Sequence, residues 1–155
     1  MKAWSRWSSL IDRRGDATPL AVARIVAGFT IAFHLQAMWL SGIGVSVWVD
    51  QKFGGLKGVD LDWLESFGGA TPANVRALMA LGFVVSLLMM AGVFTRVTTV
   101  ATYLVFRVLT GLNDHAGGSS DDLLINGLFL LMLSDCGGAL SWDNRGKPAR
   151  SVPMW

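Results

Sequence analysis

The sequence has little charge and almost no cysteine. Charged residues make up 15% of its 155 residues, against about 25% in an ordinary soluble domain. The single cysteine, Cys136, excludes an internal disulfide and a metal site built from several thiolates. We expect Cys136 to be a small buried apolar residue. The formal net charge of +2 forms no basic face, so the composition gives no support to nucleic-acid binding.

Apolar residues are abundant instead. They make up 52% of the chain, and the mean hydropathy is +0.48. A soluble chain of this length has too small a core to bury so much apolar surface. There are seven tryptophans against one tyrosine, and tryptophan favours membrane–water interfaces. The composition therefore predicts a single integral membrane domain whose helices are solvated by the lipid bilayer.

Four apolar stretches are long enough for membrane-spanning helices, and we place them at residues 19–41, 73–94, 97–113 and 122–138. The first two follow the same Ala-Thr-Pro sequence, in which Thr suits a helix N-cap and Pro the first helical position. A spanning helix needs about 20 residues, so we expect tilting or local thinning around the two shorter stretches. The predicted fold class is all-α, an integral membrane four-helix bundle.

Two of the segments outside these stretches are predicted to lie on the membrane surface. Apolar side chains share one helical face within residues 1–17, which predicts an amphipathic helix lying in the interface; a disordered tail is the alternative. The connection 42–71 is rich in aromatic residues, and we expect it to cap the outer membrane surface, with a short helix over residues 59–67. Residues 144–155 are polar, which predicts an irregular tail.

Lysine and arginine predict the orientation. They are in excess in the N-terminal segment, in the 95–96 turn and in the C-terminal tail. The 114–122 loop has three aspartates and no positive residue, and the 42–71 loop has two lysines against four acids. Positive residues favour the cytoplasmic side. We therefore expect an inner (cytoplasmic) membrane protein with both termini in the cytoplasm.

Ionisable residues inside a span are costly and need partners. Arg24, His34 and Arg107 lie within predicted spans. Arg24 is near the cytoplasmic end of the first span, where Asp135 and Asp143 are near that of the fourth. The sequence predicts an ion pair between Arg24 and one of these aspartates that joins the two helices.

A second group of polar residues lies toward the outer side. Asp114 follows Arg107 by seven residues on the same helical face, and His115 and Asp121 follow in the next loop. Together with His34 they form a candidate site at the outer rim of the bundle. One interpretation is a pocket for a polar headgroup, such as a quinone ring or a lipid. In the other, Arg107 extends outward to Asp114 and the histidines hydrogen-bond locally.

Other chemistries find less support. A haem held by His34 and His115 is disfavoured because the two residues lie at different depths. The sequence has no Ser–His–Asp order, phosphate-binding glycine loop or clustered metal-ligand spacing, so we assign no catalytic residue and no metal ligand. A transporter would need broken-helix inverted repeats, and none is visible.

Three motifs in the second half of the chain resemble a known family. They are a Gly-x-x-Thr-Arg turn between spans, a Gly-Gly-x-x-Asp loop before the last span, and a Gly–Ser–Trp–Asp exit after it. Their residues are, in this order, Gly92, Thr95 and Arg96; Gly117, Gly118 and Asp121; and Gly138, Ser141, Trp142 and Asp143. With Ala23-Arg24-Ile25 in the first span, they resemble the HTTM membrane domain shared with vitamin K-dependent gamma-carboxylases. DoxX-like four-helix membrane proteins are similar in the same places.

This resemblance covers residues 20–143 and implies a membrane helix bundle. It does not carry over carboxylase activity, because none of the four lysines lies within a span. We therefore favour a non-catalytic accessory or scaffold subunit of a larger membrane complex of electron transfer or photosynthesis. The alternative is a small membrane enzyme or carrier for a quinone, lipid or sulfur compound, an analogy at the level of fold. Its headgroup site would be His34, Arg107, Asp114 and His115.

Overall fold

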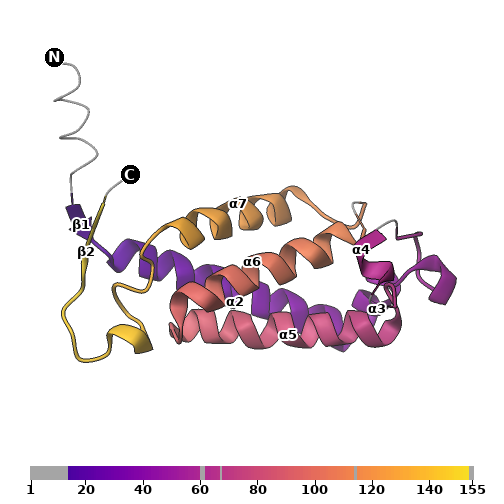
Figure 1. The fold of residues 1–155 in the computed structure, drawn as a ribbon, viewed down its shortest axis with the longest axis horizontal. Helices are drawn as coiled ribbons and strands as arrows, with labels where there is room; N and C mark the ends of the chain where they lie inside the picture. Colours follow the sequence, from indigo (N-terminus) through magenta and orange to yellow (C-terminus); the bar gives the residue numbers. More distant parts are fainter. Residues whose placement is uncertain (1–13, 60–61, 67, 114, 154–155) are drawn as a thin grey trace, which may run out of the picture.

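A computed structural model describes residues 14–59, 62–66, 68–113 and 115–153 of the chain. Apart from one short strand pair, the regular structure of these residues is helical, which confirms the predicted all-α fold. The long helices are α2 (Thr18–Ser41), α5 (Pro72–Ala91), α6 (Thr95–Gly111) and α7 (Ser119–Leu133). Helix α5 packs against α2 and α6, while α7 packs mainly against α6 and touches α2. Figure 1 shows the long helices running lengthwise as an elongated bundle.

Local sequence explains where the helices begin. The Thr71 side chain caps α5 by accepting a hydrogen bond from the Asn74 backbone N–H at 3.2 Å, and Pro72 takes the first helical position. The same Ala-Thr-Pro sequence begins α2 in a different way. Its first residue is Thr18, whose N–H donates to the Asp16 carboxylate at 3.1 Å. The N-cap position of α2 is Ala17 and Thr18 is already helical, so the prediction that Thr18 caps α2 is wrong; the Asp16 carboxylate accepts the N–H of this first helical residue instead.

The core is apolar, and α2 and α5 approach each other closely within it. A Cβ at Gly28 would lie 2.9 Å from the Ser86 carbonyl oxygen, and one at Gly82 would lie 2.8 Å from the Leu35 Cδ1. The clash at Gly28 is with backbone, so the two helices can pack this tightly only with glycine there, whereas at Gly82 the Leu35 side chain would have to move. The largest fully buried apolar side chains of the core are Phe106, Ile31, Leu35, Met79, Met89, Leu109 and Leu128.

The long connection between α2 and α5 is folded against the far end of the bundle (Figure 1). It contains α3 (Ile43–Trp48), the 3₁₀ turn η1 (Gln51–Phe53) and α4 (Asp62–Glu65), which falls within the helix expected over residues 59–67. The Asn113 amide at the end of α6 donates to the Val47 carbonyl at 3.0 Å. This contact ties the connection to the end of α6.

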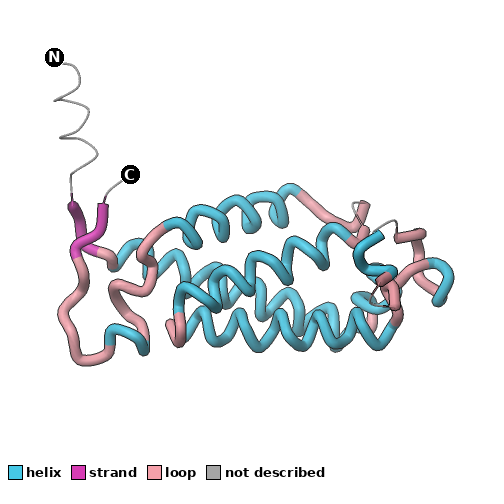
Figure 2. The backbone as a smooth tube through the Cα atoms, in the orientation of Figure 1, coloured by secondary structure: helices cyan, strands magenta, loops and turns pink. Residues whose placement is uncertain are grey.

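The two ends of the described chain pair with each other. Strand β1 (Arg14–Asp16) runs antiparallel to β2 (Ser151–Pro153), with Gly15 opposite Val152 (Figure 2, magenta). The tail predicted to be irregular therefore contains a strand. Of the predicted interfacial helix 1–17, residues 14–16 form a strand, and residues 1–13 lie outside the described part of the chain.

Within the described ranges, two helices are long and apolar enough to cross a membrane by length and composition alone, namely α2 and α5. Helices α6 and α7 are shorter, with 17 and 15 residues. Helix α7 ends at Leu133 rather than at residue 138, and the chain after it turns back across the start of α6. This turn is held by several side-chain hydrogen bonds.

Candidate functional site

The side chain of Arg24 is fully buried at the end of the bundle where α2 begins. Its Nη1 donates to the Cys136 carbonyl at 2.9 Å, and its Nη2 donates to the Leu140 carbonyl at 2.6 Å. Charge-assisted hydrogen bonds of this length are stronger than bonds between neutral groups. The guanidinium therefore joins α2 to the turn that follows α7.

Arg24 binds backbone carbonyls in the structure and not the carboxylate of Asp135 or Asp143 that the sequence predicted as its partner. Asp135 pairs with Arg150, whose Nη1 lies 3.6 Å from its Oδ2, and Asp143 acts on Arg24 only as a nearby charge. The physical reason is the early end of α7. Backbone carbonyls beyond a helix end lack helical partners, and the forked guanidinium reaches two of them at once.

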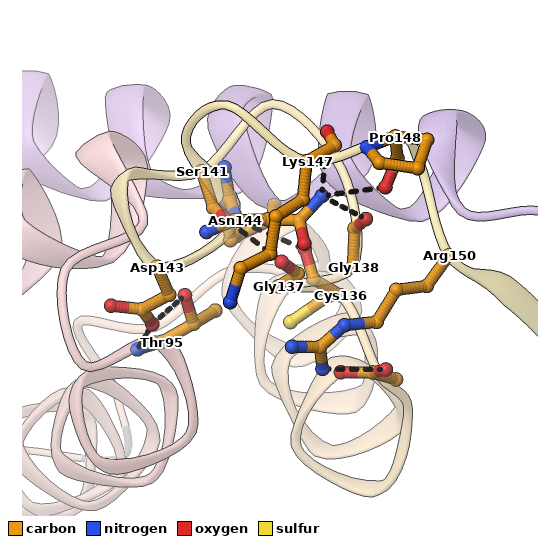
Figure 3. Close-up of polar contacts among 12 residues, drawn as sticks. Thr95, Cys136, Gly137, Gly138, Ser141, Asp143, Asn144, Lys147, Pro148 and Arg150 are labelled. Carbon is orange, nitrogen blue, oxygen red and sulfur yellow. Dashed lines mark hydrogen bonds and ion pairs between the residues drawn. The ribbon is translucent and has the colours of Figure 1, made fainter.

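The Asp143 carboxylate caps the start of α6. Its Oδ2 accepts hydrogen bonds from the Thr95 backbone N–H at 2.7 Å and from the Thr95 hydroxyl at 2.8 Å (Figure 3). Its Oδ1 accepts from the Phe94 N–H at 2.9 Å. Partial burial raises the pKa of Asp143, but these hydrogen bonds and the charge of Arg24 outweigh it and hold the pKa below its ordinary value. The carboxylate is therefore held ionised at neutral pH.

Asn144 fixes the turn from inside. It is buried, and its Nδ2 donates to the Gly138 carbonyl at 2.9 Å and to the Pro148 carbonyl at 3.0 Å (Figure 3). The Ser141 hydroxyl donates to the Gly137 carbonyl at 2.6 Å. The sequence interpretation did not single out Asn144. Its place directly after the Gly–Ser–Trp–Asp exit was the only available signal.

Two of the three motifs behind the family resemblance, the Gly-x-x-Thr-Arg turn and the Gly–Ser–Trp–Asp exit, are brought together by these contacts. A Cβ at Gly92 would collide with Ser141, and a Cβ at Gly137 would lie 3.0 Å from the Thr95 side chain. In the Gly-Gly-x-x-Asp motif, at the start of α7, the Asp121 carboxylate accepts from the Gly118 N–H at 3.0 Å and caps that helix. Each motif therefore has an architectural role at a helix end.

A groove of about 320 Å³ runs between the start of α6 and the turn after α7. Two cations, Arg96 and Arg150, and two carboxylates, Asp135 and Asp143, are among its lining residues. The four formal charges cancel. The groove therefore has no net charge with which to select an ion.

The described residues predicted to converge at the outer rim each have different surroundings. His34 is half-buried between two aromatic rings, with centroids 6.4 Å from Trp48 and 6.3 Å from Phe106. Arg107 and His115 are exposed, and Asp121 is engaged in its helix cap. Among these four described residues, no hydrogen bond or ion pair joins one to another.

Asp114, the remaining member of the predicted rim site, lies outside the described part of the chain. Next to it, the buried Asn113 is a polar residue that the sequence interpretation missed. Its Oδ1 accepts from the His115 N–H at 3.1 Å, and its amide holds the connection to α3. Within the described ranges, no group of three or more His, Cys, Asp or Glu residues is placed to hold a metal ion.

Comparisons of the chain with models of protein families, with curated proteins and with solved structures found no match. The resemblance to the HTTM domain and to DoxX-like proteins therefore stays a prediction based on motifs. The function is therefore inferred below from the surface and the polar contacts of the molecule itself.

Proposed function

We propose that this chain is an integral membrane four-helix bundle that serves as a non-catalytic accessory or scaffold subunit of a larger membrane complex. The observation that supports this is the distribution of exposed apolar side chains, which all four long helices share. Soluble monomers rarely expose contiguous apolar patches beyond a few hundred Å². Examples from α2, α5, α6 and α7, in this order, are Phe29 and Phe33; Leu81 and Val84; Val97 and Leu104; and Leu123 and Leu130.

Lipid is the solvent that suits this surface. Helices α2 and α5 have the length and composition of spans. At 1.5 Å per residue, the 17-residue α6 and the 15-residue α7 extend about 25 Å and about 22 Å. They fall short of a hydrocarbon core of about 30 Å, and local thinning of the bilayer accommodates such a mismatch at modest cost.

The pairing of the two chain ends supports the proposal that both termini lie on the same side of the membrane. The β1–β2 pair holds residues 14–16 against residues 151–153 at one end of the bundle. The start of α6, which carries Arg96, lies at this end too, because Thr95 is bound by Asp143 in the turn after α7. We propose that this end faces the cytoplasm and that the connection between α2 and α5 lies at the outer surface of the inner membrane.

The accessory role follows from how the polar groups are used. Arg24, Asp143, Asn144 and Asn113 all bind the backbone of their own chain. They stabilise the ends of the bundle, and the lateral surface is left for lipids and neighbouring helices. Complexes of electron transfer or photosynthesis are the assemblies that we propose to test first.

The test has two stages on the full chain. First, membranes are washed with alkaline carbonate; we expect the protein to stay in the pellet and to dissolve only with detergent. A chain that is monodisperse in buffer without amphiphile would overturn the membrane assignment. Second, native membranes are solubilised in mild detergent and fractionated by size; we expect co-migration with a defined complex. A protein that always elutes alone contradicts the accessory role.

One observation favours the alternative of a small-molecule carrier. The His34 imidazole makes ring contacts with Trp48 and Phe106, and within the described part of the chain it has no hydrogen-bond partner. A neutral imidazole can donate to a quinone carbonyl or accept from a hydroxyl. A ubiquinone analogue titrated into the detergent-solubilised protein would then quench tryptophan fluorescence. We expect His34→Phe to abolish the quenching and Gln36→Leu to keep it; equal quenching in both excludes the site.

A further inference from the structure

Asn126 is a polar residue in the middle of α7 that faces away from the bundle. It lies seven residues from each end of Ser119–Leu133, and it is exposed. No described residue offers its side chain a hydrogen bond. If α7 spans a membrane, as proposed above, this amide lies at mid-depth in hydrocarbon, where an unsatisfied polar group is costly.

The rest of the same face is apolar and open. Leu123, Leu130 and Leu133 are 74%, 66% and 58% exposed, and they lie with Asn126 on one side of the helix at spacings of three, four and seven residues. A Cβ at Gly127 would meet nothing within 4 Å. In contrast, the buried residues of α7 are Leu128 and Leu131, which face the bundle on the other side.

Helix α7 is therefore the long helix with the least burial against its own chain. It lies at the edge of the bundle (Figure 2), with α6 as its main neighbour. The close approach that a second helix needs is possible because Gly127 adds no side chain beside Asn126. We refer to Leu123, Asn126, Gly127, Leu130 and Leu133 as the α7 outer face.

We propose that the α7 outer face binds the α7 outer face of a second copy of this chain, with the two Asn126 amides hydrogen-bonded to each other in the membrane. This inference rests on the proposed membrane location. A carboxamide has both a donor and an acceptor, so an identical group is its complement. Two copies inserted with the same topology are related by a two-fold axis along the membrane normal, so their α7 helices meet in parallel and Asn126 faces Asn126.

The donor–acceptor match decides between the possible occupants. Lipid acyl chains offer the amide no hydrogen bond, and a wholly apolar partner helix would leave it unsatisfied. A different polar helix would satisfy it, but needs a matching group at the same depth. The second copy supplies that group at the required position by symmetry.

The test measures dimerisation of the full chain in liposomes, by single-molecule photobleaching over a series of protein-to-lipid ratios. We expect dimers for the native chain and a dimer dissociation constant about fivefold to thirtyfold higher for Asn126→Leu, the range of interhelical hydrogen bonds in model peptides. Asn126→Gln should restore dimers. The matched control is Gln36→Leu, which removes an exposed amide from α2 and should change nothing.

Cross-linking locates the contact. We expect Leu130→Cys to give disulfide-linked dimers on mild oxidation, while Leu104→Cys, which is exposed on α6, stays monomeric. A native chain that is monomeric at all ratios yet resists carbonate overturns the dimer and leaves the membrane assignment intact. Dimers unaffected by Asn126→Leu, or a Leu130→Cys cross-link only to a different protein, also overturn it. Extraction into plain buffer overturns the membrane assignment itself.

Discussion

Thr95 donates two hydrogen bonds to one carboxylate oxygen of Asp143, its backbone N–H at 2.7 Å and its hydroxyl at 2.8 Å. The two residues are 48 positions apart, so this helix cap is also a tertiary contact. It anchors the turn after α7 to the start of α6, where a negative charge is favourable because of the helix dipole. Closing this end of the bundle therefore depends on a side chain far away in the sequence.

Replacing Asp143 should weaken the fold. Asp143→Asn removes the charge and one acceptor, and we expect a loss of about 1 kcal/mol in the free energy of unfolding, as for other lost helix caps. Chemical denaturation in detergent micelles, followed by circular dichroism, measures this. Asp122→Asn is the control, because Asp122 is an exposed carboxylate in the first turn of α7 for which no hydrogen bond to a described residue exists. An equal loss in both variants would contradict the capping role.

The same carboxylate makes stability depend on pH. The pKa of Asp143 in the folded chain is below its ordinary value, so its contribution is fully present above the unfolded pKa of about 3.9 and is lost as the pH falls through the folded pKa. The stability difference between the native chain and Asp143→Asn should be constant near neutral pH and shrink below about pH 4. Denaturation midpoints across this range measure it; a difference that grows on acidification would contradict the sign.

Arg24 should be more important to the fold than any exposed arginine. Arg24→Met removes the donors to the Cys136 and Leu140 carbonyls, and we expect a loss of about 1–3 kcal/mol, the cost of leaving buried polar groups unpaired. Arg24→Lys should recover only part of this, because one ammonium cannot reproduce the fork. The control Arg76→Met replaces an exposed side chain and should stay within about 0.5 kcal/mol of the native chain. Unfolding in detergent gives all three values.

How far the sequence predicts this molecule depends on whether a feature is local. Thr71 and Pro72 gave the start of α5 correctly because a cap and its helix are adjacent. The position of Arg24 within the first apolar stretch predicted a junction with the segment around Asp135 and Asp143. It did not predict that backbone carbonyls would be the acceptors, since these carbonyls are free only because α7 ends early. The β1–β2 pair joins opposite ends of the chain, and no local pattern encodes it.

The rim site stays a prediction, and the sequence is a weak guide to it for a related reason. Spacing alone put His34 and Arg107 at a similar level of the bundle, but it does not give the rotation of each helix about its axis. That rotation is set by packing, which turns His34 toward Trp48 and Phe106 and leaves Arg107 exposed. A periodicity of 3.6 residues identifies faces of one helix, not which faces of two helices meet.

Two glycines provide a test of the packing itself. A Cβ at Gly28 would lie 2.9 Å from the Ser86 carbonyl oxygen and 3.0 Å from the Met90 Cβ, whereas a Cβ at Gly127 would meet nothing within 4 Å. Gly28→Ala must push α2 away from the α5 backbone, and we expect it to lose about 1–3 kcal/mol of stability as an overpacked core does. Gly127→Ala should be neutral or stabilising by up to about 1 kcal/mol in the monomer, because alanine is the better helix former. Unfolding of both variants at high detergent-to-protein ratio, where the chain is monomeric, decides this; a loss at Gly127 equal to that at Gly28 would mean that α7 packs against its own chain more closely than its exposed face implies.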